Sequence, residues 1–103
     1  MDPGFMSTLE AIRIKCDFPF TITSAYRDPT HPIEAKKAKP GTHASGRAVD
    51  IAVRGDKAIK LIKVAFEFGI TGLGVQQKGG GRFIHLDDLT IDDGFARPNI
   101  WSY

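Results

Sequence analysis

The sequence predicts a small α+β domain in which helices flank an antiparallel sheet. Residues 56–67 place apolar side chains at helical spacing, whereas four other segments are short and rich in β-branched or aromatic residues. Two of these segments, residues 70–75 and 83–86, are separated by a glycine-rich stretch, which favours an antiparallel hairpin. The chain has 103 residues, of which 42% are hydrophobic and 25% charged, and this composition is typical of one globular domain.

The first helix is expected to begin at Ser7 or Thr8, either of which can cap a helix, and to end near Asp17. Its apolar stripe consists of Leu9, Ile12 and either Ile14 or Cys16. Residues 1–6 contain a proline and a glycine ahead of a second methionine, so we interpret them as a frayed end or a remnant of cloning. The folded domain would then comprise residues 7–103.

The composition argues against several classes of function. Cys16 is the only cysteine, which rules out an internal disulfide, and its apolar neighbours favour a buried thiol over a nucleophile. The net charge is only +2, and acidic residues lie between the basic ones, so we expect no nucleic-acid partner. We also expect no membrane association and no signal peptide, because no apolar run approaches the roughly 18 residues of a membrane span.

Residues 21–26 favour a strand, because threonine, isoleucine and tyrosine prefer extended backbone. Arg27 follows this strand, and its guanidinium can either bind a ligand carboxylate at two points or pair with Asp28 at the surface. Turn residues then lead into a short helix through residues 33–37. We interpret His31, just before that helix, as a local structural contact or a residue at the rim of a site.

The segment HASGRAVD, which runs from His43 to Asp50, is where we expect a site to form. A neutral imidazole and a carboxylate both suit zinc, but a third ligand is needed. Residues 51–53 favour a buried strand, so Asp50 is expected where a loop enters the sheet. His85 is the best third candidate, because it alternates with apolar residues in the strand segment RFIHLDD. These three residues predict a metal site.

The clearest helix of the chain begins at Gly55 and Asp56, and Gly69 provides its stop signal. Its apolar stripe, which we interpret as core, consists of Ala58, Ile59, Leu61, Ile62, Ala65 and Phe66. Residues 78–82 are rich in glycine but run into a strand rather than a helix. They therefore predict a hairpin turn and not a phosphate-binding loop.

Four motifs follow one another along the chain: SAYR at residues 24–27, HASGRAVD at 43–50, HLD at 85–87 and a tryptophan at 101. This order resembles that of the M15 zinc peptidases, which include D-Ala-D-Ala carboxypeptidases and phage endolysins. It is most similar to the compact branch of that family. The resemblance covers about Thr21 to Trp101 and implies a zinc domain of the hedgehog and D-Ala-D-Ala peptidase type.

The resemblance also implies a role for each motif. His43, Asp50 and His85 would hold Zn2+ and leave its fourth position for water. The residues expected to contact the substrate are Ser24, Arg27 and Trp101. Arg27 would bind a substrate carboxylate, and Trp101 is expected to be buried beside the site, where its ring can pack against a ligand or line the cleft.

One position departs from the pattern of the best-known family members. They carry an acidic residue three positions before the last histidine, and this chain has Arg82 there, which cannot act as a base. Asp87 is the nearest acid on the same strand face as His85, and it can serve either as the catalytic proton carrier or as the group that orients the imidazole. Asp88 is the weaker candidate, because alternation sends it to the opposite face.

The resemblance therefore implies a zinc-dependent peptidase that acts on amide bonds of peptidoglycan stem peptides. A second interpretation, favoured by Arg82, is a non-catalytic zinc-stabilised structural or wall-binding module, and a third is a metal-free binding domain. We expect a monomer with Zn2+ as its cofactor, held in the cytoplasm until release or carried in a phage particle. Which peptide bond is cut depends on the shape of the pocket rather than on the motifs.

Overall fold

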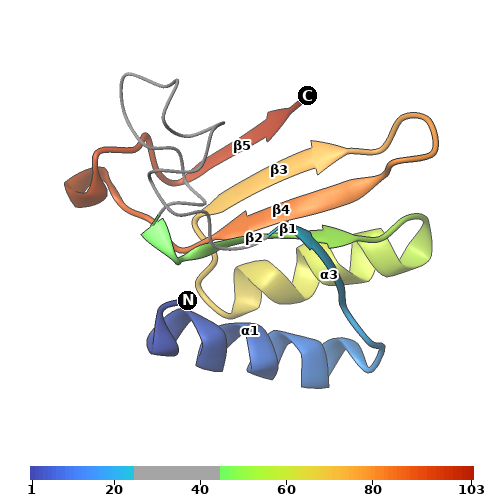
Figure 1. Ribbon diagram of the computed structural model, residues 1–103, viewed down its shortest axis with the longest axis horizontal. Helices are drawn as coiled ribbons and strands as arrows, with labels where there is room; N and C mark the ends of the chain where they lie inside the picture. Colours follow the sequence, from blue (N-terminus) through green and yellow to red (C-terminus); the bar gives the residue numbers. More distant parts are fainter. Residues whose placement is uncertain (25–44) are drawn as a thin grey trace.

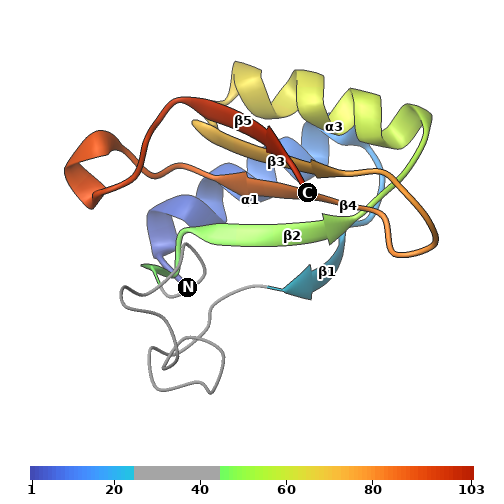
Figure 2. The same ribbon diagram turned by 90° about the horizontal axis from the view of Figure 1, so that it is seen from above.

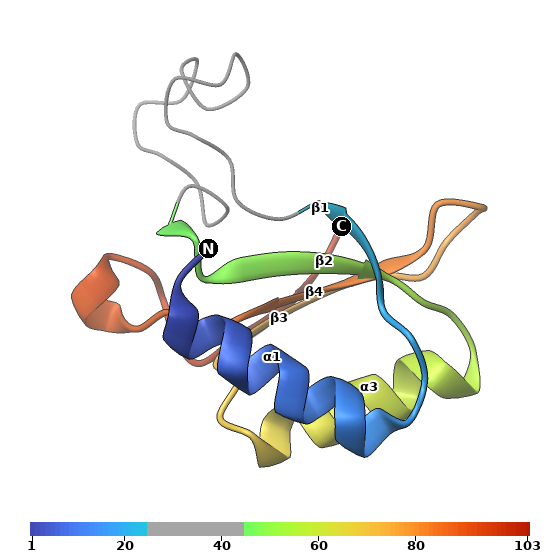
Figure 3. The ribbon, with the colours of Figure 1, turned by 60° about the horizontal axis from the view of Figure 1, so that its bottom comes forward.

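The computed structural model describes residues 1–24 and 45–103. The described elements are, in order, α1 (Pro3–Cys16), β1 (Thr21–Ser24), β2 (Ala48–Ala52), α3 (Asp56–Glu67), β3 (Gly72–Gln76), β4 (Phe83–Asp87), the short 3-10 helix η2 (Ile91–Asp93) and β5 (Asn99–Ser102). The two α-helices lie together on one face of the sheet (Figures 1 and 3). The predicted α+β class is confirmed.

The five strands form one sheet in the order β1-β2-β4-β3-β5 (Figure 2). Strand β4 pairs antiparallel with both β2 and β3, as the predicted hairpin requires, and β1 pairs antiparallel with β2. However, β5 pairs parallel with β3, so the expectation of a purely antiparallel sheet is wrong at this edge. Strand β4 has β2 on one side and β3 on the other. Strand β5, which follows β4 in the chain, therefore pairs with the outer edge of β3 and runs in the same direction as β3.

Helix α1 begins at Pro3, which is four residues before the expected cap at Ser7. The cap is Asp2, whose Oδ2 accepts a hydrogen bond from the backbone N–H of Phe5 at 2.8 Å, and proline is well suited to the first helical position. Phe5 is 0% exposed, so the interpretation of residues 1–6 as a frayed end is wrong. The buried residues of α1 are Phe5, Leu9, Ile12 and Cys16.

The buried stripe of α3 is narrower than the sequence predicts. Its fully buried members are Ala58, Leu61, Val64 and Ala65. Ile59 and Phe66, which were expected in the core, are exposed. Helix α3 packs against α1 and the sheet (Figure 3), and Val64 is among its buried residues. Neither α-helix of the described residues is long and apolar enough to span a membrane.

The sheet presents its apolar face to the helices. The buried strand residues of the core cluster are Val49, Ile51, Leu73, Ile84 and Leu86. Cys16 joins the same core, and burial raises the pKa of its thiol, which fits the expected buried cysteine. Since side chains alternate along a strand, Asp50 in β2 and His85 in β4 point to the opposite face. Asp50 thus lies in the middle of a strand and not at its entrance as predicted.

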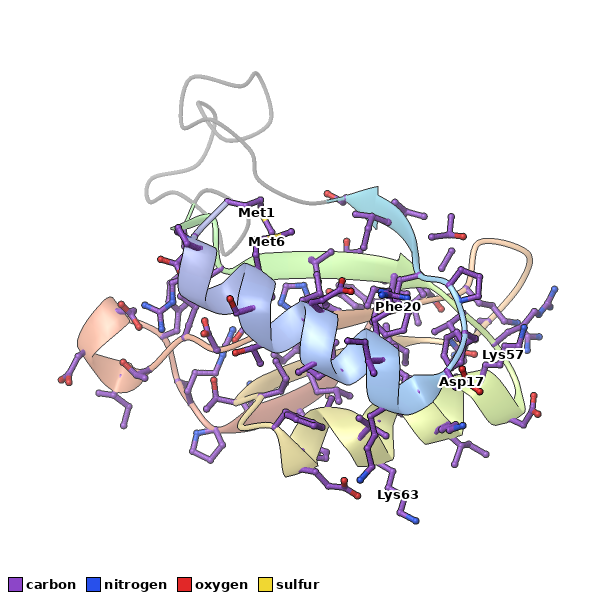
Figure 4. All side chains as sticks on the ribbon, turned by 90° about the horizontal axis from the view of Figure 1, so that it is seen from below. Met1, Met6, Asp17, Phe20, Lys57 and Lys63 are labelled. Carbon is purple, nitrogen blue, oxygen red and sulfur yellow. The ribbon has the colours of Figure 1, made fainter. Side chains whose placement is uncertain are left out.

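The position of Phe5 gives a test of the domain boundary. Phe5→Ala should lower the free energy of unfolding by about 3–5 kcal/mol, the usual cost of removing a buried phenylalanine side chain. Met6 is 44% exposed at the same end of α1 (Figure 4), so Met6→Ala is the matched control and should change the free energy by less than about 0.5 kcal/mol. Urea denaturation followed by circular dichroism measures both. Equal stability of the two variants would exclude residues 1–6 from the folded domain.

Candidate active site

The register of the sheet aligns four predicted site residues in one row across the strands. Ser24 pairs with Asp50, Asp50 with His85, His85 with Gly74, and Gly74 with Trp101. Residues that lie opposite one another in a sheet share a face, so these side chains all project away from the two helices. The row therefore gathers residues from segments that are far apart in the sequence.

His85 lies between two carboxylates. Its Nδ1 is 2.9 Å from Oδ1 of Asp50, and its Nε2 is 2.7 Å from Oδ2 of Asp87. The His85 side chain is 2% exposed and the Asp87 side chain is fully buried. Burial of polar groups is costly unless they are hydrogen-bonded, and none of the buried side-chain nitrogen or oxygen atoms in the described residues lacks a partner.

Both carboxylate oxygens of Asp87 are engaged. Arg97 donates from Nε to Oδ1 at 2.9 Å and from Nη2 to Oδ2 at 2.7 Å, which is the two-point geometry of a strong arginine–carboxylate pair. The backbone N–H of Leu89 donates to Oδ1 as well, at 3.3 Å. Burial alone would raise the pKa of Asp87, but the hydrogen bonds from His85 and Arg97 outweigh it and lower this pKa to about 2.

The two carboxylates also change the proton affinity of His85. Burial of the imidazole alone would lower its pKa, but the hydrogen bonds with Asp50 and Asp87 outweigh burial and raise the pKa above the ordinary value of 6.5. The position between Asp50 and His85 Nδ1 is therefore one that favours a cation, whether a proton or a metal ion.

Two glycines in β3 make room for the C-terminal residues. A Cβ atom at Gly74 would lie 2.6 Å from Nε1 of Trp101, and one at Gly72 would lie 2.2 Å from Oδ1 of Asp87. Trp101 thus lies across β3, with its ring centroid 5.1 Å from that of His85. Trp101 was expected to be buried and is half-buried. Both glycines mark positions where another side chain approaches the strand closely.

Tyr103 adds a second aromatic ring on this face. Its ring centroid is 5.1 Å from that of Phe83, and a Cβ atom at Gly74 would lie 3.0 Å from its hydroxyl oxygen. Burial raises the pKa of the Tyr103 phenol, although a hydrogen bond with Trp101 opposes this. Neither Tyr103 nor Arg97 was predicted from the sequence. The signal for Arg97 was its place four residues before Trp101, which is too weak to recognise without the paired strands.

The remaining predicted site residues have separate outcomes. His43 and Arg27 lie outside the described residues, as does His31. Asp88 accepts a hydrogen bond from Arg47 Nε at 2.8 Å, away from His85. Arg82 donates from its Nε to the backbone carbonyl of Gly79 at 2.9 Å, within the hairpin that joins β3 to β4.

Asp50 and His85 fit two positions of a tetrahedral zinc site. Two ligand atoms at zinc-bond distance lie about 3.3 Å apart in that geometry, so the observed separation of 2.9 Å needs to widen by only a few tenths of an ångström. A carboxylate oxygen and an imidazole nitrogen are also the donor types that zinc accepts. Residues 1–24 and 45–103 contain no group of three histidine, cysteine or acidic side chains arranged to hold a metal ion. Asp50 and His85 are thus two candidate ligands supplied by the described residues.

A family model described as Peptidase M15 matches residues 2–87. The chain belongs to the peptidase M15 family. Members of the M15 family are typically zinc peptidases, and the matched range contains Asp50, His85 and Asp87. It ends before Arg97 and Trp101. No curated protein and no solved structure matched the chain.

The raised pKa of His85 predicts a pH dependence of stability in the metal-free protein. Because the folded pKa exceeds 6.5, the contribution of His85 to stability is complete below about pH 6.5 and is lost as the pH rises through the folded pKa. Urea denaturation with excess chelator, from about pH 5.5 to 8.5, should show a loss of stability in the wild type that His85→Gln lacks. A constant difference between the two proteins over this range would contradict the prediction.

Proposed function

We propose that the chain is a zinc-dependent peptidase that hydrolyses amide bonds in peptidoglycan stem peptides. The observation that carries this proposal is the pair of donor atoms, Asp50 Oδ1 and His85 Nδ1, held 2.9 Å apart with Asp87 on the far side of the imidazole. A histidine ligand whose second nitrogen is bonded to a carboxylate is the usual arrangement in zinc sites.

His43 is the proposed third ligand, together with Asp50 and His85. Zinc bound there would supply a Lewis acid for the scissile carbonyl and acidify water. The protein's own contribution is to hold two of the donors rigidly on paired strands, where they need little reorganisation. Trp101 covers one side of His85 and so limits the access of water to the imidazole.

Asp87 is proposed to orient His85 and not to carry the catalytic proton. A general base must reach the water molecule from which it takes a proton. Both oxygens of Asp87 are already used by His85, Arg97 and the backbone of Leu89, and the side chain is fully buried. Its low pKa, about 2, also makes it a weak base. The position of Asp87 therefore favours the orienting alternative of the two that the sequence left open.

The proposed substrate is a peptidoglycan stem peptide, which is a more specific assignment than membership of the M15 family. Arg27, directly after the SAY segment, is proposed to bind a carboxylate of the stem peptide with its planar guanidinium. Ser24 lies beside Asp50 at the near end of the same row, which supports a place in the substrate cleft. Trp101 lies at the opposite end and offers an apolar wall.

A second function has one observation in its favour. Arg82 occupies the position at which the best-known M15 members carry an acid, and Asp87 is fully engaged in hydrogen bonds. A zinc-stabilised module that binds the cell wall without cutting it would have no need of a base. This alternative predicts zinc binding without turnover.

The primary test measures zinc content and turnover together. The purified protein should bind about one zinc ion per chain, and mass spectrometry of a muropeptide digest should show products that chelator abolishes. His43→Ala and His85→Ala should each lose zinc, since each removes a proposed ligand. Wild-type zinc content in both variants would refute the ligand assignment, and zinc binding without any product would select the module.

Asp87→Asn separates an orienting carboxylate from a proton carrier. If Asp87 orients His85, the amide should weaken zinc binding roughly 10- to 100-fold, and excess zinc should restore turnover. If Asp87 carries the proton, zinc binding should stay intact while turnover disappears at every zinc concentration. We expect the first result. The measurement is a zinc titration of hydrolysis, paired with a direct zinc affinity for each protein.

A further inference from the structure

We propose that Arg97 is a positioning residue that fixes His85 as a metal ligand by holding Asp87. This inference rests on the proposed zinc site and adds a residue that lies beyond the range matched by the family model. It assigns a function to the C-terminal segment that follows β4. In this view the segment supports the metal site through the contact of Arg97 with Asp87, and it contributes no ligand.

The contact between Arg97 and Asp87 is built for orientation. The guanidinium binds both oxygens of the carboxylate, at 2.9 and 2.7 Å, so the carboxylate plane cannot rotate freely. The Arg97 side chain is only 6% exposed, and it competes with little water for this contact. A lysine at this position would offer a point charge without the planar two-point geometry.

The surroundings hold Arg97 in this pose from two further sides. Its guanidinium carbon lies 4.9 Å from the ring centroid of Trp101 and 5.4 Å from that of Phe95. Such stacking favours a cation over the ring face. Gly72 opens the route across β3, since a Cβ atom there would lie 2.5 Å from Arg97 Nε. The glycine, the two aromatic rings and the carboxylate thus enclose one guanidinium.

The orientation of Asp87 sets the tautomer of His85. When Oδ2 of Asp87 accepts a proton from Nε2, the lone pair of a neutral imidazole is on Nδ1, which faces Asp50. Without Arg97, Asp87 would remain a buried carboxylate that has lost its two-point partner and is free to turn. His85 would then present a mixture of tautomers and ring orientations, and zinc affinity would fall.

Arg47 provides a matched control within the same part of the fold. It donates from Nε to Asp88 Oδ1 at 2.8 Å and from Nη1 to Asp93 Oδ1 at 3.1 Å, so it also holds two acidic partners. Its side chain is more exposed, at 29%, and neither partner contacts His85. Loss of Arg47 should therefore affect stability through ion pairs without altering the imidazole.

The experiment compares Arg97→Gln, Arg97→Lys and Arg47→Gln with the wild type. Zinc affinity is measured for the metal alone by competition with a chromogenic chelator, and stability is measured by urea denaturation. Both Arg97 variants should bind zinc roughly 10- to 100-fold more weakly, the usual effect of losing support behind a histidine ligand. Arg47→Gln should bind zinc within about threefold of the wild type even where its stability falls as much.

A second readout follows the imidazole directly. Nitrogen NMR of the zinc-loaded wild type should show His85 with its proton on Nε2, and Arg97→Lys should weaken that signature even though it keeps the charge. Gly72→Ala should also weaken zinc binding, because its methyl group would displace both the Asp87 carboxylate and the Arg97 guanidinium.

The outcomes separate the two levels of the proposal. Wild-type zinc affinity in both Arg97 variants, or an equal loss of affinity in Arg47→Gln, would overturn the positioning role while leaving the zinc site intact. A wild-type protein that binds no zinc would overturn the proposed site itself, and the positioning role with it.

Discussion

The hydrogen bonds from His85 to Asp50 and Asp87 are the interactions on which the whole row depends. Asp50, His85, Asp87 and Arg97 alternate in charge when the imidazole carries a proton or faces a cation. Each buried group thus has opposite charge beside it, which offsets the high cost of removing charges from water. Removal of any one member would leave its neighbour without one of its oppositely charged partners. The sheet must therefore hold its register, because a slip of one residue would turn His85 toward the core.

The two faces of the sheet have separate tasks. Val49, Ile84 and Leu86 anchor the sheet to the helices through close-packed apolar contacts. The same strands carry the polar row on their other face. Packing of the core therefore also fixes the backbone positions of the site residues. His85 benefits most, since β4 lies between β2 and β3 and is the central strand of the sheet.

Part of this arrangement could be predicted from local pattern. The alternation in RFIHLDD and the glycine-rich turn before it were enough to place His85 on a strand, with Asp87 on the same face. Its pairing with Asp50 is set by the register of β2 and β4. The start of α1 was missed because Ser7 and Thr8 are also good caps, and only the burial of Phe5 decides in favour of Asp2. The parallel pairing of β5 depends on the free edge of β3, which exists only once the sheet has formed. A short segment of sequence cannot predict it. Arg97 was missed for the same reason, because it reaches Asp87 from outside any helix or strand.

The pair of glycines in β3 has a consequence for the order in which the site forms during synthesis. Asp50 and His85 are made well before Arg97 and Trp101, yet the latter two cross β3 to complete the surroundings of the imidazole. A nascent chain that ends just after β4 contains every donor proposed here for the metal but lacks the residues that enclose them. Glycines also lower the intrinsic stability of β3, so this strand gains most from the late arrival of β5 along its edge. The residues that follow β4 are thus the ones that turn a loose set of donors into a fixed site.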